Sequence, residues 1–115
     1  MHEFVMIFRN ESIGEIKLSP EGMLTVSKDW ENWIGNIAAQ NKLASRGARL
    51  GTDGKTVRPG NVVTNGPYAE IKEIIGGLII VRADSIEEAT EMTNGCPILS
   101  VGGNIEIRNV IAMNN

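Results

Sequence analysis

Apolar residues along the chain follow patterns that predict both strands and helices. Residues 4–8 and 78–81 form continuous apolar runs, which are typical of strands buried on both faces. Residues 104–108 alternate polar and apolar positions, and this predicts a strand with one exposed face. The chain is therefore expected to contain a sheet with at least two interior strands.

A long helix is predicted after the first strand. Ser19 and the proline that follows it are typical of a helix start, and we expect a short helical turn there. A second start is better marked, because Ser27 is a capping residue and two acidic residues follow it in the first turn. We expect the long helix to end near Arg46, with Gly47 as its left-handed cap.

Both tryptophans lie on the apolar stripe of this predicted helix. Trp30 and Trp33 are spaced i, i+3, and further apolar residues continue the stripe at helical spacing. The favoured interpretation is that they pack the helix onto a sheet, because aromatic side chains dominate core energetics. The alternative is stacking against a ligand, and Trp33 is therefore retained as a candidate ligand-binding residue.

Turn residues are frequent in the middle of the chain. Pro59-Gly60 separates two short segments, 55–58 and 61–64, and this arrangement predicts a hairpin. Asn65-Gly66-Pro67 then predicts a turn, because Asn and Gly tolerate the positive φ that such turns require.

A second helix is predicted after the apolar run 78–81. Ser85, with Glu88 three residues later, fits a capping box, and Asn94-Gly95 is expected to end the helix. Cys96 follows directly, next to a proline. We interpret it as a buried, unreactive cysteine rather than as a nucleophile.

The predicted elements occur in the order strand, helix, strand or hairpin, strand, helix, strand. This order favours an α+β fold, with a ferredoxin-like antiparallel sheet of four strands and two helices on one face. The other face then needs a cover, and for a chain of 115 residues a second copy is the simplest one. We expect one domain over residues 1–115 and a homodimer built sheet to sheet.

The composition argues against several kinds of partner and site. The net charge is −3, so nucleic acid is not an expected partner. The N-terminal apolar run is too short for a membrane span or a signal-peptide core, and no membrane partner is expected. A single cysteine fits a reducing compartment, which favours a cytoplasmic protein. With one histidine and one cysteine, neither a metal site nor a cofactor is expected.

A set of short motifs between residues 65 and 108 resembles a known family. The motifs are Asn65-Gly66-Pro67-Tyr68-Ala69-Glu70, Lys72-Glu73, Gly76-Gly77, Glu88-Ala89, Cys96-Pro97, Gly102-Gly103 and Glu106-Ile107-Arg108. In their order and spacing they resemble the YCII-related family, and more narrowly its branch named for an Asp-Gly-Pro-Phe motif. This resemblance implies a ferredoxin-like fold that pairs into a dimeric α+β barrel.

The resemblance implies little about activity. Most relatives are uncharacterised bacterial proteins, some accompany or are fused to sigma factors, and one enzyme branch has a proposed catalytic His–Asp pair. In this chain Asn65 stands where the motif has Asp, and Tyr68 replaces Phe. The single histidine, His2, precedes the first strand and matches no catalytic position. The sequence does not support a His–Asp mechanism and leaves catalytic residues unidentified.

Polar residues of the motif region and of the last strand form the candidate ligand-binding site. They are Asn65, Tyr68, Glu70, Lys72, Glu106 and Arg108. Glu106 and Arg108 are two positions apart on a strand and share a face. In one interpretation Lys72 or Arg108 binds an anionic small molecule while Glu70 or Glu106 transfers a proton. In the other, these charges form ion pairs at the edge of the sheet or dimer.

Two classes of function follow from these alternatives. The first is a homodimeric small-molecule-binding protein, with or without enzymatic activity, whose cleft lies near residues 65–72. The second is a non-catalytic interaction or regulatory module that works with a sigma-type transcription factor. An enclosed pocket beside Lys72 or Arg108 would favour the first, and a shallow groove with exposed charges would favour the second.

Overall fold

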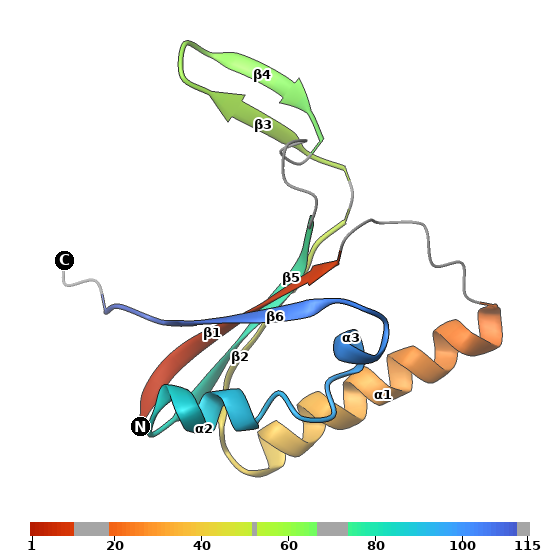
Figure 1. Cartoon of the computed structure of the whole chain (residues 1–115), viewed down its shortest axis with the longest axis vertical. Coiled ribbons are helices and arrows are strands. Elements are labelled where there is room, and N and C mark those ends of the chain that lie inside the picture. Colours follow the sequence, from red (N-terminus) through yellow and green to blue (C-terminus); the bar gives the residue numbers. More distant parts are fainter. Residues whose placement is uncertain (11–18, 52, 67–73, 113–115) are drawn as a thin grey trace.

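The computed structural model describes residues 1–10, 19–51, 53–66 and 74–112 (Figure 1). The strands are β1 His2–Asn10, β2 Leu43–Arg49, β3 Lys55–Arg58, β4 Val62–Asn65, β5 Ile74–Ala83 and β6 Asn104–Asn109. The helices are α1 Pro20–Ala39, α2 Ile86–Glu91 and α3 Pro97–Ser100. The fold is α+β with an antiparallel sheet, which confirms the predicted fold class.

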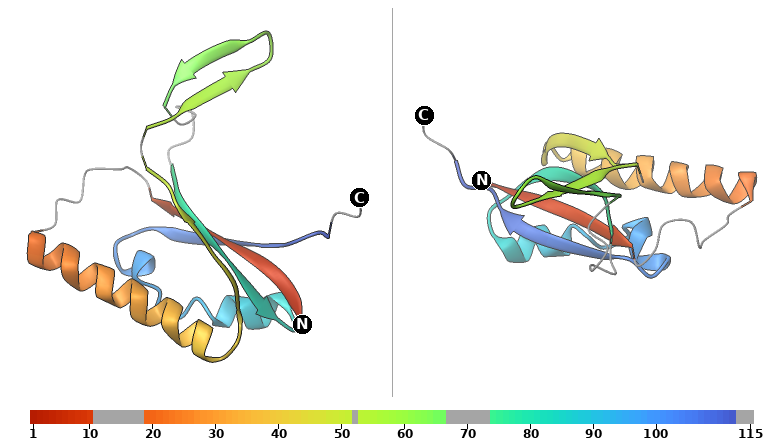
Figure 2. Two further views of the ribbon diagram at one scale, coloured as in Figure 1. Left: turned by 180° about the vertical axis from the view of Figure 1, so that it is seen from behind. Right: turned by 90° about the horizontal axis from the view of Figure 1, so that it is seen from above.

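The main sheet contains four strands in the order β2-β5-β1-β6. Strands β1 and β5 occupy its centre, as their continuous apolar sequences predicted, and every pairing is antiparallel. The helices lie on one side of this sheet, as Figure 1 and the left view of Figure 2 show. The strand order and the single helix layer are those of a ferredoxin-like fold.

Helix α1 differs from its prediction at both ends. It is one continuous helix from Pro20, and the Oγ of Ser19 accepts a hydrogen bond from the Gly22 amide at 3.0 Å. The predicted second start at Ser27 was therefore wrong, because the first cap is strong enough to begin the whole helix. The helix ends at Ala39 rather than near Arg46.

Asn41 explains the early end of α1. Asn41 takes a positive φ of 60°, and the next amide, that of Lys42, donates to the carbonyl of Ile37 at 3.1 Å. This pattern is a Schellman-type end in which Asn replaces the usual Gly. The chain then turns into β2, which the sequence did not predict and which forms one edge of the sheet. The predicted hairpin is confirmed as β3–β4, but it lies outside the main sheet.

The core lies between the sheet and the helices. Its buried residues are Phe4, Met6, Phe8, Trp33, Ile37, Ile79, Val81, Ala83, Ala89, Cys96 and Ile98. Phe8 meets Trp30 and Trp33 edge to face, with ring centroids 5.0 and 5.9 Å apart. The packing interpretation of the two tryptophans is thus confirmed, and these rings fix α1 against the centre of the sheet.

The second predicted helix is also confirmed. The Oγ of Ser85 accepts from the Glu88 amide at 3.1 Å, and α2 begins at the next residue. Cys96 is buried, as predicted, and burial raises the pKa of its thiol to about 11. At neutral pH this thiol is therefore protonated and a weak nucleophile.

Candidate functional site

In the described part of the chain, all three helices lie on one face of the main sheet, and the opposite face carries none (Figures 1 and 2). Two cross-strand rows lie on it at the centre of the sheet. The strand registers place Ile80, Val5 and Arg108 in one row, and Leu78, Ile7 and Glu106 in the other. The four apolar side chains of these rows are only partly buried, whereas their sequence neighbours on the helix side are buried. This open face therefore combines an apolar centre with charges along β6.

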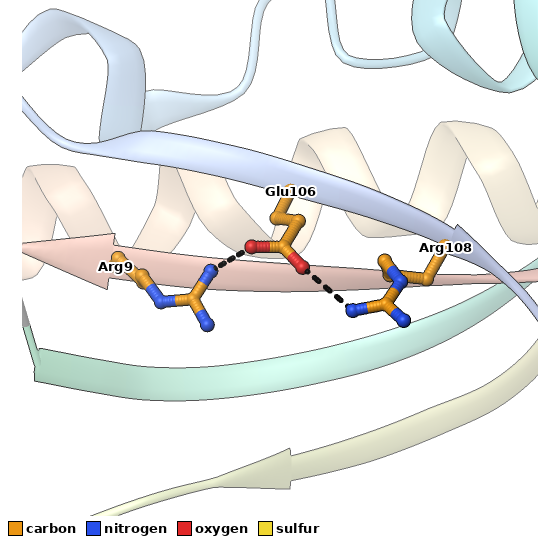
Figure 3. Close-up of polar contacts among 3 residues, drawn as sticks. All are labelled: Arg9, Glu106 and Arg108. Atoms are coloured by element: carbon orange, nitrogen blue, oxygen red, sulfur yellow. Dashed lines mark hydrogen bonds and ion pairs between the residues drawn. The ribbon is translucent and has the colours of Figure 1, made fainter.

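Three charged residues form a cluster on the open face (Figure 3). Arg9, at the end of β1, donates from Nη1 to Oε1 of Glu106 on β6. The other carboxylate oxygen of Glu106, Oε2, accepts from Nη1 of Arg108 at 3.3 Å. Two guanidinium groups therefore flank one carboxylate, and the cluster carries a net positive charge.

The two arginines differ in the exposure of their side chains, and therefore in how many N–H donors each can offer to a ligand. The side chain of Arg9 is 22% exposed, whereas that of Arg108 is 68% exposed and holds Glu106 by one long contact. An arginine has five N–H donors in a planar fork that matches a carboxylate or a phosphate. Arg108 thus keeps most of its donors available beside the apolar centre of the open face.

The charge state of Glu106 bears on its predicted role in proton transfer. Its hydrogen bond to Arg9, and then that to Arg108, hold the pKa of Glu106 below its ordinary value. Desolvation acts in the opposite direction and is outweighed. A general acid at neutral pH needs a raised pKa, so this environment favours a permanent anion that positions the arginines.

We expect the side-chain carboxyl of Glu106 to titrate below the usual glutamate range. Because the folded-state pKa is lowered, the cluster adds stability above the ordinary pKa, and that stability is lost as pH falls through the folded value. Carbon-detected NMR of the Glu106 carboxyl checks this expectation. Arg9→Gln should move the titration midpoint back upward, and an unchanged midpoint in that variant would contradict the assigned cause.

The other candidate residues lie elsewhere in the molecule or outside the described part of the chain. Asn65 is at the end of β4, where its Oδ1 accepts from Nζ of Lys55 at 2.8 Å. These two residues, with Asp53 and the neighbouring glycines, line a shallow hollow at the base of the β3–β4 hairpin. Tyr68, Glu70 and Lys72 lie outside the described residues.

Trp33 lies on the helix side of the sheet, away from the Glu106 cluster. It is 7% exposed, and its indole N–H donates to the carbonyl of Met92 at 3.1 Å. Its position identifies it as a core residue that also forms part of a second hollow, between the end of α1 and α2. Lys42 and Glu88, which also line this hollow, form an ion pair at 2.8 Å.

Arg9 is the member of the cluster that sequence reasoning missed. It follows the apolar run 4–8 directly and shares a strand face with Val5 and Ile7 by alternation, which was the available signal. The partner strand of β1 had to be known before Arg9 was placed opposite β6. Glu106 and Arg108 were predicted to share a face, and the structure confirms that they do.

Within residues 1–10, 19–51, 53–66 and 74–112, no group of three His, Cys, Asp or Glu side chains is arranged to hold a metal ion. In the same part of the chain, no helix is both long and apolar enough to cross a membrane.

The chain matches a known family over almost its whole length. A family model described as a YCII-related domain matches residues 17–114. The matched segment includes the three helices, strands β2 to β6, and the Glu106 and Arg108 positions, whereas β1 and Arg9 precede it. A comparison with curated proteins finds no match.

Proposed function

The chain belongs to the YCII-related family, and from this premise we propose that it is a homodimer that binds a small organic anion at the Arg9–Glu106–Arg108 cluster. We further propose that it belongs to the branch named for the Asp-Gly-Pro-Phe motif, because residues 65–68 read Asn-Gly-Pro-Tyr. A cytoplasmic location fits its single cysteine.

The observation that carries the proposal is the guanidinium of Arg108 beside an apolar sheet face. This side chain is 68% exposed in a single protomer, which alone would favour the interaction module, so an enclosed pocket around it requires a second copy over this face. Glu106 neutralises one of two arginines, so the cluster keeps one unit of positive charge for a ligand. Val5 and Ile7 lie next to these charges in the strand register and offer a surface to the apolar part of a ligand. A carboxylate or phosphate attached to a small carbon skeleton suits both features.

The homodimer is supported by the composition of the open face. Its centre is apolar, and its margin carries both signs of charge, with Glu3 and Glu106 against Arg9, Arg82 and Arg108. A surface of mixed sign can be complementary to a second copy of itself across a two-fold axis. A second copy on this face would also enclose the cluster and strengthen its hold on an anion by excluding water.

Binding is favoured over proton-transfer chemistry by the lowered pKa of Glu106. A carboxylate paired with two arginines stays ionised at neutral pH and orients their donors. The alternative function, an interaction module for a sigma-type transcription factor, is kept as one outcome of the test below.

We expect small organic anions to raise the melting temperature of the protein in a thermal-shift screen. A ligand present at about 100 times its dissociation constant adds roughly 2.7 kcal/mol of stability. Arg108→Gln and Arg9→Gln should each abolish the shift. Lys28→Gln, which removes one positive charge from exposed α1, should retain it.

Two results would contradict the proposal. A shift that persists in both arginine variants would locate binding elsewhere, and the hollow between α1 and α2 would be the next place to test. The absence of any shift across carboxylates and phosphates would favour the interaction module. Sedimentation equilibrium of the unmodified chain tests the homodimer separately, and a monomer at all concentrations would overturn it.

A further inference from the structure

The β3–β4 hairpin is exposed on both of its faces. All four residues of β4 are exposed, and in β3 only Thr56 is partly buried. Val57, Val62 and Val63 are 69%, 52% and 53% exposed. Side-chain hydrogen bonds described for Lys55, Thr56 and Thr64 stay within the hairpin and its base. The hairpin thus presents apolar side chains that its own domain does not cover.

An isolated two-stranded ribbon is marginally stable in water, and exposed valines make it a poor free-standing element. The register pairs Val57 with Val63 on one face, between the Lys55–Asn65 pair and the tip. On the other face Thr56 pairs with Thr64, and Arg58 pairs with Val62. The Val57–Val63 pair is therefore the more apolar face, and it is the face that gains most from being covered.

The position of the hairpin shows where a cover would come from. It rises beyond the ends of β2 and β5, on the side of the sheet away from the helices (Figures 1 and 2). The radius of gyration, 15.8 Å, exceeds the ~13 Å of a compact chain of about 100 residues, as a projecting arm requires. A body seated on the open face would lie directly beside this arm.

The opposite end of the sheet carries a matching patch. There β1 begins and β6 ends, and the amide of Val110 donates to the carbonyl of Glu3 at 3.0 Å. Val110 and Ile111 are 40% and 77% exposed at this end, next to the exposed Glu3. The arm and this end of the sheet therefore both present apolar side chains that the protomer leaves exposed.

We propose that the β3–β4 hairpin is an arm that packs against a second copy of this chain, with Val57 and Val63 over the partner's Val110 and Ile111. This inference rests on the sheet-to-sheet homodimer of the proposed function. It adds the orientation of the two copies, because a two-fold axis across the strands brings the arm of each protomer to the far end of the other. An axis along the strands would instead bring the two arms together.

Sedimentation equilibrium on the full chain tests the arm. The double variant Val57→Thr/Val63→Thr keeps side-chain shape and removes apolar surface, so the dimer dissociation constant should rise by roughly tenfold or more. Val62→Thr makes the same chemical change on the other face and should alter the constant by no more than about twofold. Equal dissociation constants for the double variant and the unmodified chain would overturn the arm.

Disulfide trapping tests the orientation. A Val57→Cys chain mixed with an Ile111→Cys chain should give a cross-linked dimer under mild oxidation, whereas each chain alone should give little. The native thiol of Cys96 is buried and contributes no cross-link. Efficient cross-linking of Val57→Cys with itself, and none in the mixture, would overturn the proposed orientation by showing that the arms meet each other.

The failure of the arm can be distinguished from the failure of the dimer. Ile7→Glu places a charge at the centre of the open face and should dissociate the dimer while the hairpin is intact. If Ile7→Glu raises the dimer dissociation constant but no hairpin variant does, the proposed role of the arm is overturned and the homodimer is not. An unmodified chain that is monomeric throughout overturns the proposed homodimer and the arm with it.

Discussion

Gly47→Ala should lower the free energy of unfolding by at least about 2 kcal/mol. Gly47 has a φ of +61°, a conformation that costs a residue with a Cβ roughly 1–2 kcal/mol. An added Cβ would also lie 1.9 Å from the carbonyl oxygen of Leu78 on the neighbouring strand. Because both obstacles are backbone, β2 would have to separate locally from β5. Urea denaturation at one fixed protein concentration measures the loss.

Gly76→Ala is the matched control for this prediction. Gly76 also lies at the β2–β5 edge of the sheet, but a Cβ there meets nothing within 4 Å, and its φ is not positive. We expect a change within about 0.5 kcal/mol of the unmodified chain. Equal stabilities for the two alanine variants would show that the close approach of Gly47 to Leu78 does not constrain the sheet.

The Gly47 region shows which structural feature the sequence predicts correctly and which it does not. A positive φ at Gly47 was expected, and it is observed, but the residue lies within β2 and not at the end of a helix. The register of β2 against β5 shifts between Ser45 and Ala48, on either side of Gly47, as in a bulge that uses a left-handed glycine. A bulged edge strand of small and charged residues has no clear alternation, so its partner β5 decides its structure.

Predictions from the sequence were more reliable for features whose physical cause lies within a few neighbouring residues. The cap at Ser85 and the turn at Pro59-Gly60 were predicted correctly, because each depends on residues within one turn of chain. The ion-paired cluster depends on strand pairing between residues 9 and 106. Glu106 and Arg108 could be predicted as neighbours from alternation alone, whereas Arg9 required the order β1-β6.

Trp33→Ala should cost about 3–5 kcal/mol of stability, the usual range for removing a large buried aromatic side chain. Trp33 is 7% exposed and meets the rings of Phe8 and Trp30 edge to face, with centroids 5.9 and 5.8 Å away. The substitution also leaves the Met92 carbonyl without its indole donor. The loss of stability therefore has two causes, a cavity in the core and an unpaired carbonyl acceptor beside α2. Urea denaturation followed by circular dichroism measures it.

Trp33→Phe separates these two contributions. It keeps an aromatic ring in the core but cannot donate to Met92, so its cost should fall to about 1–2 kcal/mol. Trp30→Ala is the second comparison, because Trp30 shares the ring cluster but is only partly buried, and it should cost less than Trp33→Ala. If Trp33 instead served mainly to stack a ligand, Trp33→Ala would leave the free energy of unfolding almost unchanged and remove the thermal shift caused by the anion. The indole bond to Met92 and the contact with Phe8 argue for the first result, because they show a side chain that is 7% exposed and packs against its own protein.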